Sequence, residues 1–274
     1  MRVHRPVLAT LTLAAGALLA AQPPSSPTPT PAPDSLPGTT QGTGRPPAPA
    51  PVSTLGGSPL AGWVVVLDPG HGGEDVGVRA GDLQEAPLAL DLAHRTVAAL
   101  TEQGARVLLT READEGPDPD VRAATANRAG GHAFISLHLN RSPRPGASGT
   151  EIYTHAGAAA GLVAGTDPAS ATRPRLALVP WDRVQDRHAP AAEALAAHLE
   201  TAFTSRLPMG RYPRQRLPLR ALAGVDMPAV LLEVAYLSNP AQAAAVVTPE
   251  FQASVAEAIS DALLQARQAA GVPR

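Results

Sequence analysis

Short runs rich in β-branched and other apolar residues alternate with longer stretches of helical periodicity from Trp63 onward. This alternation is typical of a sheet covered by helices. Several of the runs are continuously apolar, as strands covered on both faces are. We therefore expect an α/β fold: a single domain with a mostly parallel twisted sheet flanked by helices on both faces. Its strands are expected at residues 63–67, 105–109, 133–139, 149–153 and 229–236.

Four segments have the periodicity of helices: residues 86–103, 120–128, 189–206 and 249–270. The first accommodates Pro87 in its first turn and ends at Gly104. An apolar stripe at spacings of three and four predicts that four of its side chains face the core: Leu90, Ala93, Val97 and Leu100. Residues 156–186 are rich in Gly, Ala and Pro without a clear period, so we expect a loop-like insertion there.

The first 60 residues are expected to lie outside the folded domain. Arg2, His4 and Arg5 precede an apolar run that ends in small residues, which predicts a signal peptide over residues 1–21. The run has about 15 residues, fewer than the about 20 of a membrane-spanning helix. Residues 22–60 are rich in Pro, Ser and Thr and predict a disordered linker. The prediction is an exported protein of the periplasm, cell envelope or extracellular space, with a catalytic domain over residues 61–274.

The overall charge excludes some classes of partner. A formal net charge of −2 provides no basic surface for nucleic acid or for an anionic membrane. We therefore expect no nucleic-acid partner, and no stable membrane association after cleavage of the signal peptide. Because the sequence has no cysteine, stability must come from packing, a metal or both.

Four side chains that could bind a metal or transfer a proton lie at the ends of expected strands or at the start of the first helix. His71 lies in L-D-P-G-H-G-G, directly after the first strand, where ligands gather in open α/β sheets. Glu85 directly precedes the first expected helix, and His138 lies in S-L-H-L-N at the end of another strand. Glu233 lies in A-V-L-L-E-V-A-Y, a strand expected to be buried on both faces.

Taken singly, three of the four have a structural explanation. A glycine-rich turn explains His71, the helix dipole explains Glu85, and a hydrogen-bonded core histidine explains His138. Glu233 is harder to explain because an unpaired buried carboxylate is costly. Together, two imidazoles and a carboxylate are the ligand set of hydrolytic zinc, which leaves a fourth position for water. A further glutamate then serves as the acid/base that takes a proton from water and passes it to a leaving amine.

The sequence resembles the zinc-dependent N-acetylmuramoyl-L-alanine amidases of the amidase-3 family. The resemblance extends from about Val64 to the C-terminus. It departs from the family's usual residues at positions such as Pro87 and Leu139, without removing any of the four side chains. Seven ordered blocks carry it: L-D-P-G-H-G-G (67–73), E followed by L-A-L-D-L-A (85–93), T-R (110–111), R-A-A-T-A-N (122–127), F-I-S-L-H-L-N (134–140), G-T-E-I-Y (149–153) and M-P-A-V-L-L-E-V-A-Y-L-S-N-P (227–240).

The resemblance implies that His71, Glu85 and His138 hold one zinc ion (Zn2+) per domain and that Glu233 is catalytic. It implies hydrolysis of the amide bond between N-acetylmuramic acid and L-alanine of the stem peptide in peptidoglycan. Peptidoglycan, the expected partner, lies outside the cytoplasmic membrane. That location agrees with the predicted export.

Two other functions remain open. A degenerate amidase fold would bind peptidoglycan without cleaving it, although such a protein should have lost one of the four side chains. A zinc peptidase acting on stem peptides would use the same metal chemistry, and only the substrate pocket separates the two.

Two further expectations concern substrate and regulation. Asn140 and Glu151 are the candidate substrate contacts. Some relatives block the zinc with a glutamate of an insertion until an activator displaces it. Residues 156–186 contain no glutamate, so an activator protein is possible but not expected.

Overall fold

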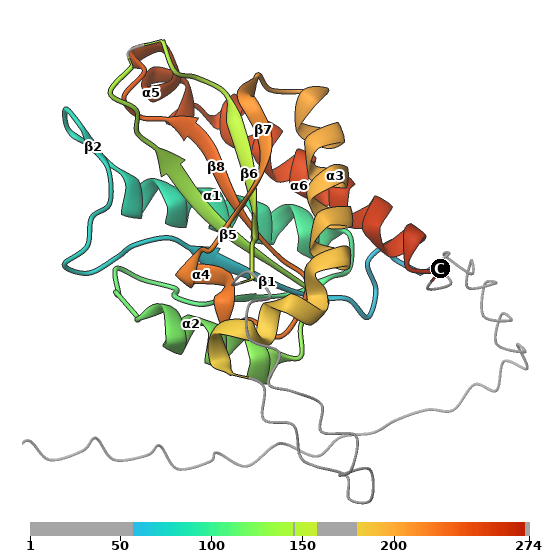
Figure 1. Ribbon diagram of the computed structural model, residues 1–274. Helices are drawn as coiled ribbons and strands as arrows, with labels where there is room; N and C mark the ends of the chain where they lie inside the picture. Colours follow the sequence, from blue (N-terminus) through green and yellow to red (C-terminus); the bar gives the residue numbers. More distant parts are fainter. Residues whose placement is uncertain (1–56, 145, 158–179, 272–274) are drawn as a thin grey trace, which may run out of the picture. The chain divides into compact units, whose positions relative to one another are not determined.

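Six strands form one sheet in the order β4-β1-β5-β8-β6-β7 in this computed structural model, which describes residues 57–144, 146–157 and 180–271 (Figure 1). The first four strands run parallel, β6 runs antiparallel to β8, and β7 runs parallel to β6. The expectation of a mostly parallel sheet is therefore confirmed. The strands are β1 (Val64–Pro69), β4 (Arg106–Leu109), β5 (Ala133–Asn140), β6 (Thr150–His155), β7 (Met209–Leu217) and β8 (Ala229–Tyr236).

Successive side chains of the central strands enter two cores, one on each face of the sheet. Val65 and Leu67 pack into the larger core, whereas Val66 packs into the smaller one. Helices cover both cores, as expected (Figure 1). The larger core lies under α1 (Glu85–Glu102), α3 (Ala189–Thr204) and α6 (Pro249–Ala269), and the smaller one under α2 (Pro119–Ala129) and α4 (Arg220–Ala223).

The buried stripe of α1 differs from the expected one. Ala93 and Leu100 are buried as predicted, but Leu90 and Val97 are only partly buried. The buried face instead includes Leu88, Leu92 and Thr96. The Thr96 hydroxyl donates to the Leu92 carbonyl at 2.8 Å, so this polar side chain enters the core without an unpaired group.

Several elements were not expected from the sequence. β7 is an edge strand with mostly exposed side chains, so it lacks the apolar pattern of a buried strand. A 3₁₀ helix, η2 (Trp181–His188), begins inside the segment expected to be a loop, which corrects that part of the prediction. The others are the hairpin of β2 (Arg79–Ala80) and β3 (Leu83–Gln84), the short α4, and α5 (Pro240–Val246).

Three predictions concern residues outside those described. The signal peptide over residues 1–21 lies there entirely, as do most of the linker over residues 22–60 and residues 158–179 of the insertion. Among the described helices, none combines the length and apolar character needed to cross a bilayer.

Candidate metal centre

The loop after β1 holds His71 in a left-handed backbone conformation. His71 has a φ of 58° and is the only non-glycine residue with positive φ in the described part of the chain. This conformation costs free energy, so surrounding contacts must hold it. The His71 Nδ1 atom lies 2.7 Å from a carboxylate oxygen of Asp75, and its ring meets that of His138 at 4.9 Å between centroids.

Glu85 is the first residue of α1, and only 2% of it is exposed. Two backbone amides fix its carboxylate: Val78 donates to Oε2 at 2.8 Å and Leu139 donates to Oε1 at 2.9 Å. The backbone at Gly77 passes so close that a Cβ there would lie 2.5 Å from Oε2. The carboxylate is therefore held in one orientation before any ligand binds.

The predicted metal ligands converge on one point. Glu85 Oε1 lies 3.1 Å from His71 Nε2 and 2.9 Å from His138 Nδ1. Each residue offers a donor atom within 4.8 Å of the others. Donor atoms around a tetrahedral zinc ion with bonds of about 2.0–2.1 Å are about 3.3 Å apart. The donor types and their spacing thus fit a metal ion held between three elements: the β1 loop, the α1 start and β5.

Glu233 lies on β8 directly opposite His138 of β5 in the strand register. The two side chains share the face of the sheet that carries the smaller core, because Phe134 and Leu231 of the same strands pack there. Glu233 Oε2 is buried and has no hydrogen-bond partner among the described residues. Burial raises the pKa of Glu233 to about 7. A carboxyl group with this pKa exchanges protons readily near neutral pH.

The two candidate substrate contacts lie beside these groups. Glu151 is opposite Glu233 in the β6–β8 register and is 6% exposed. It accepts hydrogen bonds from the Tyr153 hydroxyl and, at 3.5 Å, from Asn140 Nδ2. Asn140 lines the same cavity as Glu233. His138, Glu233 and Glu151 therefore form a row across three neighbouring strands.

The charges of the centre depend on one another. Hydrogen bonds that the His71 ring donates to Glu85 and then to Asp75 raise the pKa of His71 to about 9. Burial alone would raise the pKa of Glu85, but hydrogen bonds with His138 and His71 outweigh it and hold that pKa well below its usual range. A hydrogen bond with His71 lowers the pKa of Asp75. The centre therefore contains two ionised carboxylates that favour bound positive charge.

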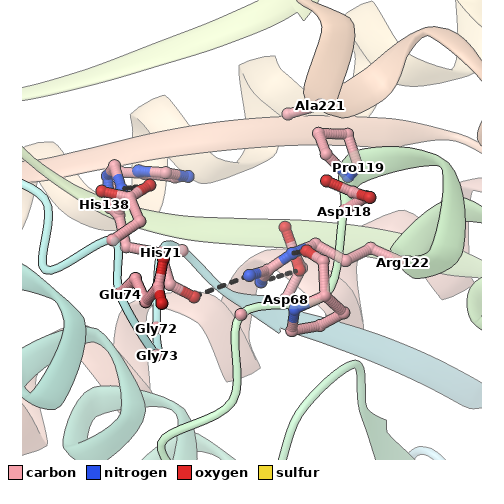
Figure 2. Close-up of a pocket in the computed structure, with 14 residues that line it drawn as sticks. Asp68, His71, Gly72, Gly73, Glu74, Asp118, Pro119, Arg122, His138 and Ala221 are labelled. Carbon is pink, nitrogen blue, oxygen red and sulfur yellow. Dashed lines mark hydrogen bonds and ion pairs between the residues drawn. The ribbon is translucent and has the colours of Figure 1, made fainter. Parts of the chain in front are cut away.

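Two open cavities meet at the centre. One of about 720 Å³ contains Glu233, Asn140 and the three predicted ligands, together with two exposed arginines, Arg79 and Arg141. The other, of about 620 Å³, extends past His71 toward Asp118 and Arg122 (Figure 2). A groove on both sides of the centre suits an extended substrate whose reacting bond lies between its ends.

Sequence reasoning missed the residues that support the ligands. Asp75 has no role in the predicted site, although it lies four positions after His71 and two positions beyond the glycine-rich motif (67–73). Arg111 and Arg122 lie in the T-R and R-A-A-T-A-N blocks but had no assigned role. Both are buried beneath the β1 loop and donate to its backbone carbonyls. Only the motif blocks themselves pointed to these arginines.

Comparisons with known proteins show the family to which the chain belongs. Residues 65–265 match the family described as N-acetylmuramoyl-L-alanine amidase (Amidase_3). The germination-specific N-acetylmuramoyl-L-alanine amidase of Bacillus subtilis is 27% identical over 222 residues, which cover 76% of this chain and 81% of that protein. N-acetylmuramoyl-L-alanine amidase AmiC of Neisseria meningitidis is 29% identical, over 72% of this chain and 51% of that protein.

The similarity extends to solved structures. The N-acetylmuramoyl-L-alanine amidase AmiC2 of Nostoc punctiforme superposes with a TM-score of 0.60 at 25% identity, covering 76% of this chain and 99% of that one. Its coverage corresponds to the folded α/β domain described above. The chain belongs to the Amidase_3 family of N-acetylmuramoyl-L-alanine amidases, enzymes that hydrolyse the bacterial cell wall.

Proposed function

We propose that this chain is a zinc-dependent amidase that cleaves the bond between N-acetylmuramic acid and L-alanine in peptidoglycan. His71, Glu85 and His138 hold the metal, and Glu233 is the catalytic acid/base. The observation that carries the proposal is the arrangement of Glu233, whose partly buried carboxylate lies beside three converging donor atoms. A fold that only bound peptidoglycan would not need such an acid.

The donor set favours zinc among common metals. Two imidazoles and one carboxylate are typical of hydrolytic zinc sites, whereas calcium and magnesium prefer oxygen ligands alone. A zinc ion held there supplies Lewis acidity and lowers the pKa of nearby water. Asp75 accepts a hydrogen bond from His71 Nδ1, which directs Nε2 toward Glu85 Oε1, and a metal ion bound there would replace the proton on Nε2.

Glu233 then carries the proton through the reaction. In its ionised form it accepts the proton of the attacking water, and the neutral form donates it to the nitrogen of the departing L-alanine. A pKa near 7 suits both steps because neither protonation state is strongly favoured. Glu151 and Asn140 lie next to this acid and are the proposed substrate contacts on that side of the groove.

The location follows from the substrate. Peptidoglycan lies outside the cytoplasmic membrane, so the enzyme must be exported, and the predicted signal peptide over residues 1–21 provides a route. The protein then acts in the periplasm, cell envelope or extracellular space. The structure of the CwlD amidase of Clostridioides difficile, which has a similar fold, was solved in complex with the GerS lipoprotein. For this chain we propose activity without such a partner, because the insertion over residues 156–186 has no glutamate to block the metal.

The test is digestion of purified peptidoglycan, with mass spectrometry of the released products. Wild type should release intact stem peptides that begin with L-alanine, and chelation should abolish this. Glu233→Gln should lower the rate by about 10²–10⁴-fold. Glu102→Gln, a change of the same type on the exposed side of α1, is the matched control and should leave the rate unchanged.

Three results would contradict the proposal. Cleavage within the stem peptide would indicate a peptidase. Peptidoglycan binding without any cleavage would indicate a binding module. Full activity in Glu233→Gln would exclude the assigned acid/base.

A further inference from the structure

Two buried arginines lie directly beneath the loop that carries His71. Arg111 is 2% exposed and Arg122 is 8% exposed. Burying a guanidinium group is costly unless its N–H groups find acceptors. Here most of the acceptors are backbone carbonyl oxygens rather than carboxylates. The two side chains therefore fix the position of the backbone more than they neutralise charge.

Their donors are concentrated on three consecutive carbonyls of the loop. Arg111 donates to Pro69 O at 2.9 Å and to Gly70 O at 2.8 Å. Arg122 donates to Pro69 O at 2.7 Å and to His71 O at 2.6 Å. The carbonyl of the strained residue His71 is therefore itself one of the acceptors.

Each arginine also anchors the loop to another part of the fold. Arg111 donates to Ala86 O at 2.8 Å, next to Glu85 at the start of α1, so it links the elements that carry two of the three ligands. Arg122 extends from α2 and pairs with Asp68 at 3.0 Å (Figure 2). Asp68 also accepts hydrogen bonds from the hydroxyls of Thr110 and Ser136, so the pair is fully anchored.

We infer that Arg111 and Arg122 are positioning residues that preorganise the metal centre by holding the His71 loop in its left-handed conformation. This inference rests on the proposed function, because it requires that His71 and Glu85 bind metal. Neither arginine reaches the reacting atoms. They act through the backbone, by fixing the direction of the His71 ring and its distance from Glu85.

The geometry requires guanidinium groups in particular. Each arginine spreads its donors over several acceptors in different directions, which the single ammonium of lysine cannot match. Lysine retains the charge and most of the length. Arg111→Lys and Arg122→Lys therefore test the hydrogen-bond fork rather than the charge.

The experiment measures Zn2+ and Co2+ affinity of the metal-free protein by competition with a chromophoric chelator, and the visible spectrum of the Co2+ form. Both lysine variants should bind metal about 10–100-fold more weakly, as losses of supporting contacts typically do. Their Co2+ spectra should differ from wild type because the ligand geometry is no longer fixed.

The matched control is Arg267→Lys. Arg267 is equally buried at 7% exposure and also donates to a backbone carbonyl, Pro59 O at 2.7 Å, but lies on α6 outside the centre. The Arg267→Lys substitution should lower the melting temperature and leave metal affinity at the wild-type value. Lysine variants of Arg111 and Arg122 that lose stability yet bind metal as wild type does would overturn the inference.

If a lysine variant does not fold, Asp68→Asn takes its place. This isosteric change removes the charged anchor of Arg122 and keeps the guanidinium, and it should weaken metal binding several-fold. Unchanged affinity in Asp68→Asn would count against the inference. Failure of wild type itself to bind metal would instead overturn the proposed function.

Discussion

His138 and Glu233 face each other across the neighbouring parallel strands β5 and β8. His138 is a proposed metal ligand and Glu233 is the proposed acid/base. The distance between these two residues is therefore fixed by backbone pairing of β5 with β8 rather than by a loop. In a strand, the next residue points to the opposite face. A shift of β8 by one position would therefore move Glu233 into the larger core and place an apolar side chain beside His138.

The raised pKa of Glu233 predicts a pH-dependent stability of the metal-free protein. The unfolded chain has a value near 4.5 and the folded protein a pKa of about 7. Between these values the folded protein retains a proton that the unfolded chain has released, so stability falls as pH rises through this window. Glu233→Gln should remove the effect and be about 1–3 kcal/mol more stable than wild type at pH 8. Urea denaturation of both proteins at pH 5 and pH 8 measures it; equal differences at the two pH values would contradict the assignment.

The hydrogen bond from His71 to Asp75 predicts a role for Asp75 in metal affinity. Asp75→Asn should weaken zinc binding by about 10–100-fold, because a carboxylate partner orients the imidazole and increases its basicity. Glu74→Gln is the control, since Glu74 is the adjacent exposed acid in the same loop. Competition titration of the metal-free proteins with a chelator measures the zinc affinity of each variant. Equal losses in both variants would indicate that only the local negative charge matters.

The close packing of Gly70 against His138 predicts that even one methyl group disrupts the centre. A Cβ at Gly70 would lie 2.3 Å from Cε1 of the His138 ring. Gly70→Ala should therefore displace His138 and abolish tight zinc binding, with a destabilisation of about 1–3 kcal/mol from overpacking. Gly146→Ala, at a position with open space around it, should change neither property. Calorimetric zinc titration and thermal melts provide both measurements.

Removal of the metal should lower the melting temperature. A ligand at 100 times its Kd stabilises the folded state by about 2.7 kcal/mol, which for a domain of this size corresponds to about 5–10 °C. Thermal melts with and without chelator measure the shift. His71→Ala and His138→Ala should melt at the same temperature in both conditions. A chelator effect that persists in these variants would place the metal elsewhere.

The convergence of the four proposed site residues and most of the fold could be predicted from the sequence, for a physical reason. His71, Glu85, His138 and Glu233 lie at strand ends or a helix start, and parallel strands bring such positions to one edge of a sheet. The strand expected at residues 229–236 has those bounds in the structure, because both of its faces are buried and Glu233 alone interrupts its apolar run.

What could not be predicted depends on contacts that leave little trace in the sequence. β7 is stabilised by pairing with β6 at the sheet edge, and its side chains carry no apolar alternation. Arg111 and Arg122 bind backbone carbonyls more than 40 positions away, and a carbonyl is present at every residue. Only the folded structure shows which carbonyls these arginines reach.

The three proposed ligands come from separate elements of a chain that has no cysteine and so cannot form a disulfide. Glu85 and His138 are 53 positions apart in the sequence. An ion that joins them closes that loop as a disulfide would, and a covalent link of this span removes chain entropy worth on the order of 4 kcal/mol from the unfolded state. Unlike a disulfide, this cross-link is indifferent to the redox state of the surroundings. The cross-link forms only when the metal is available.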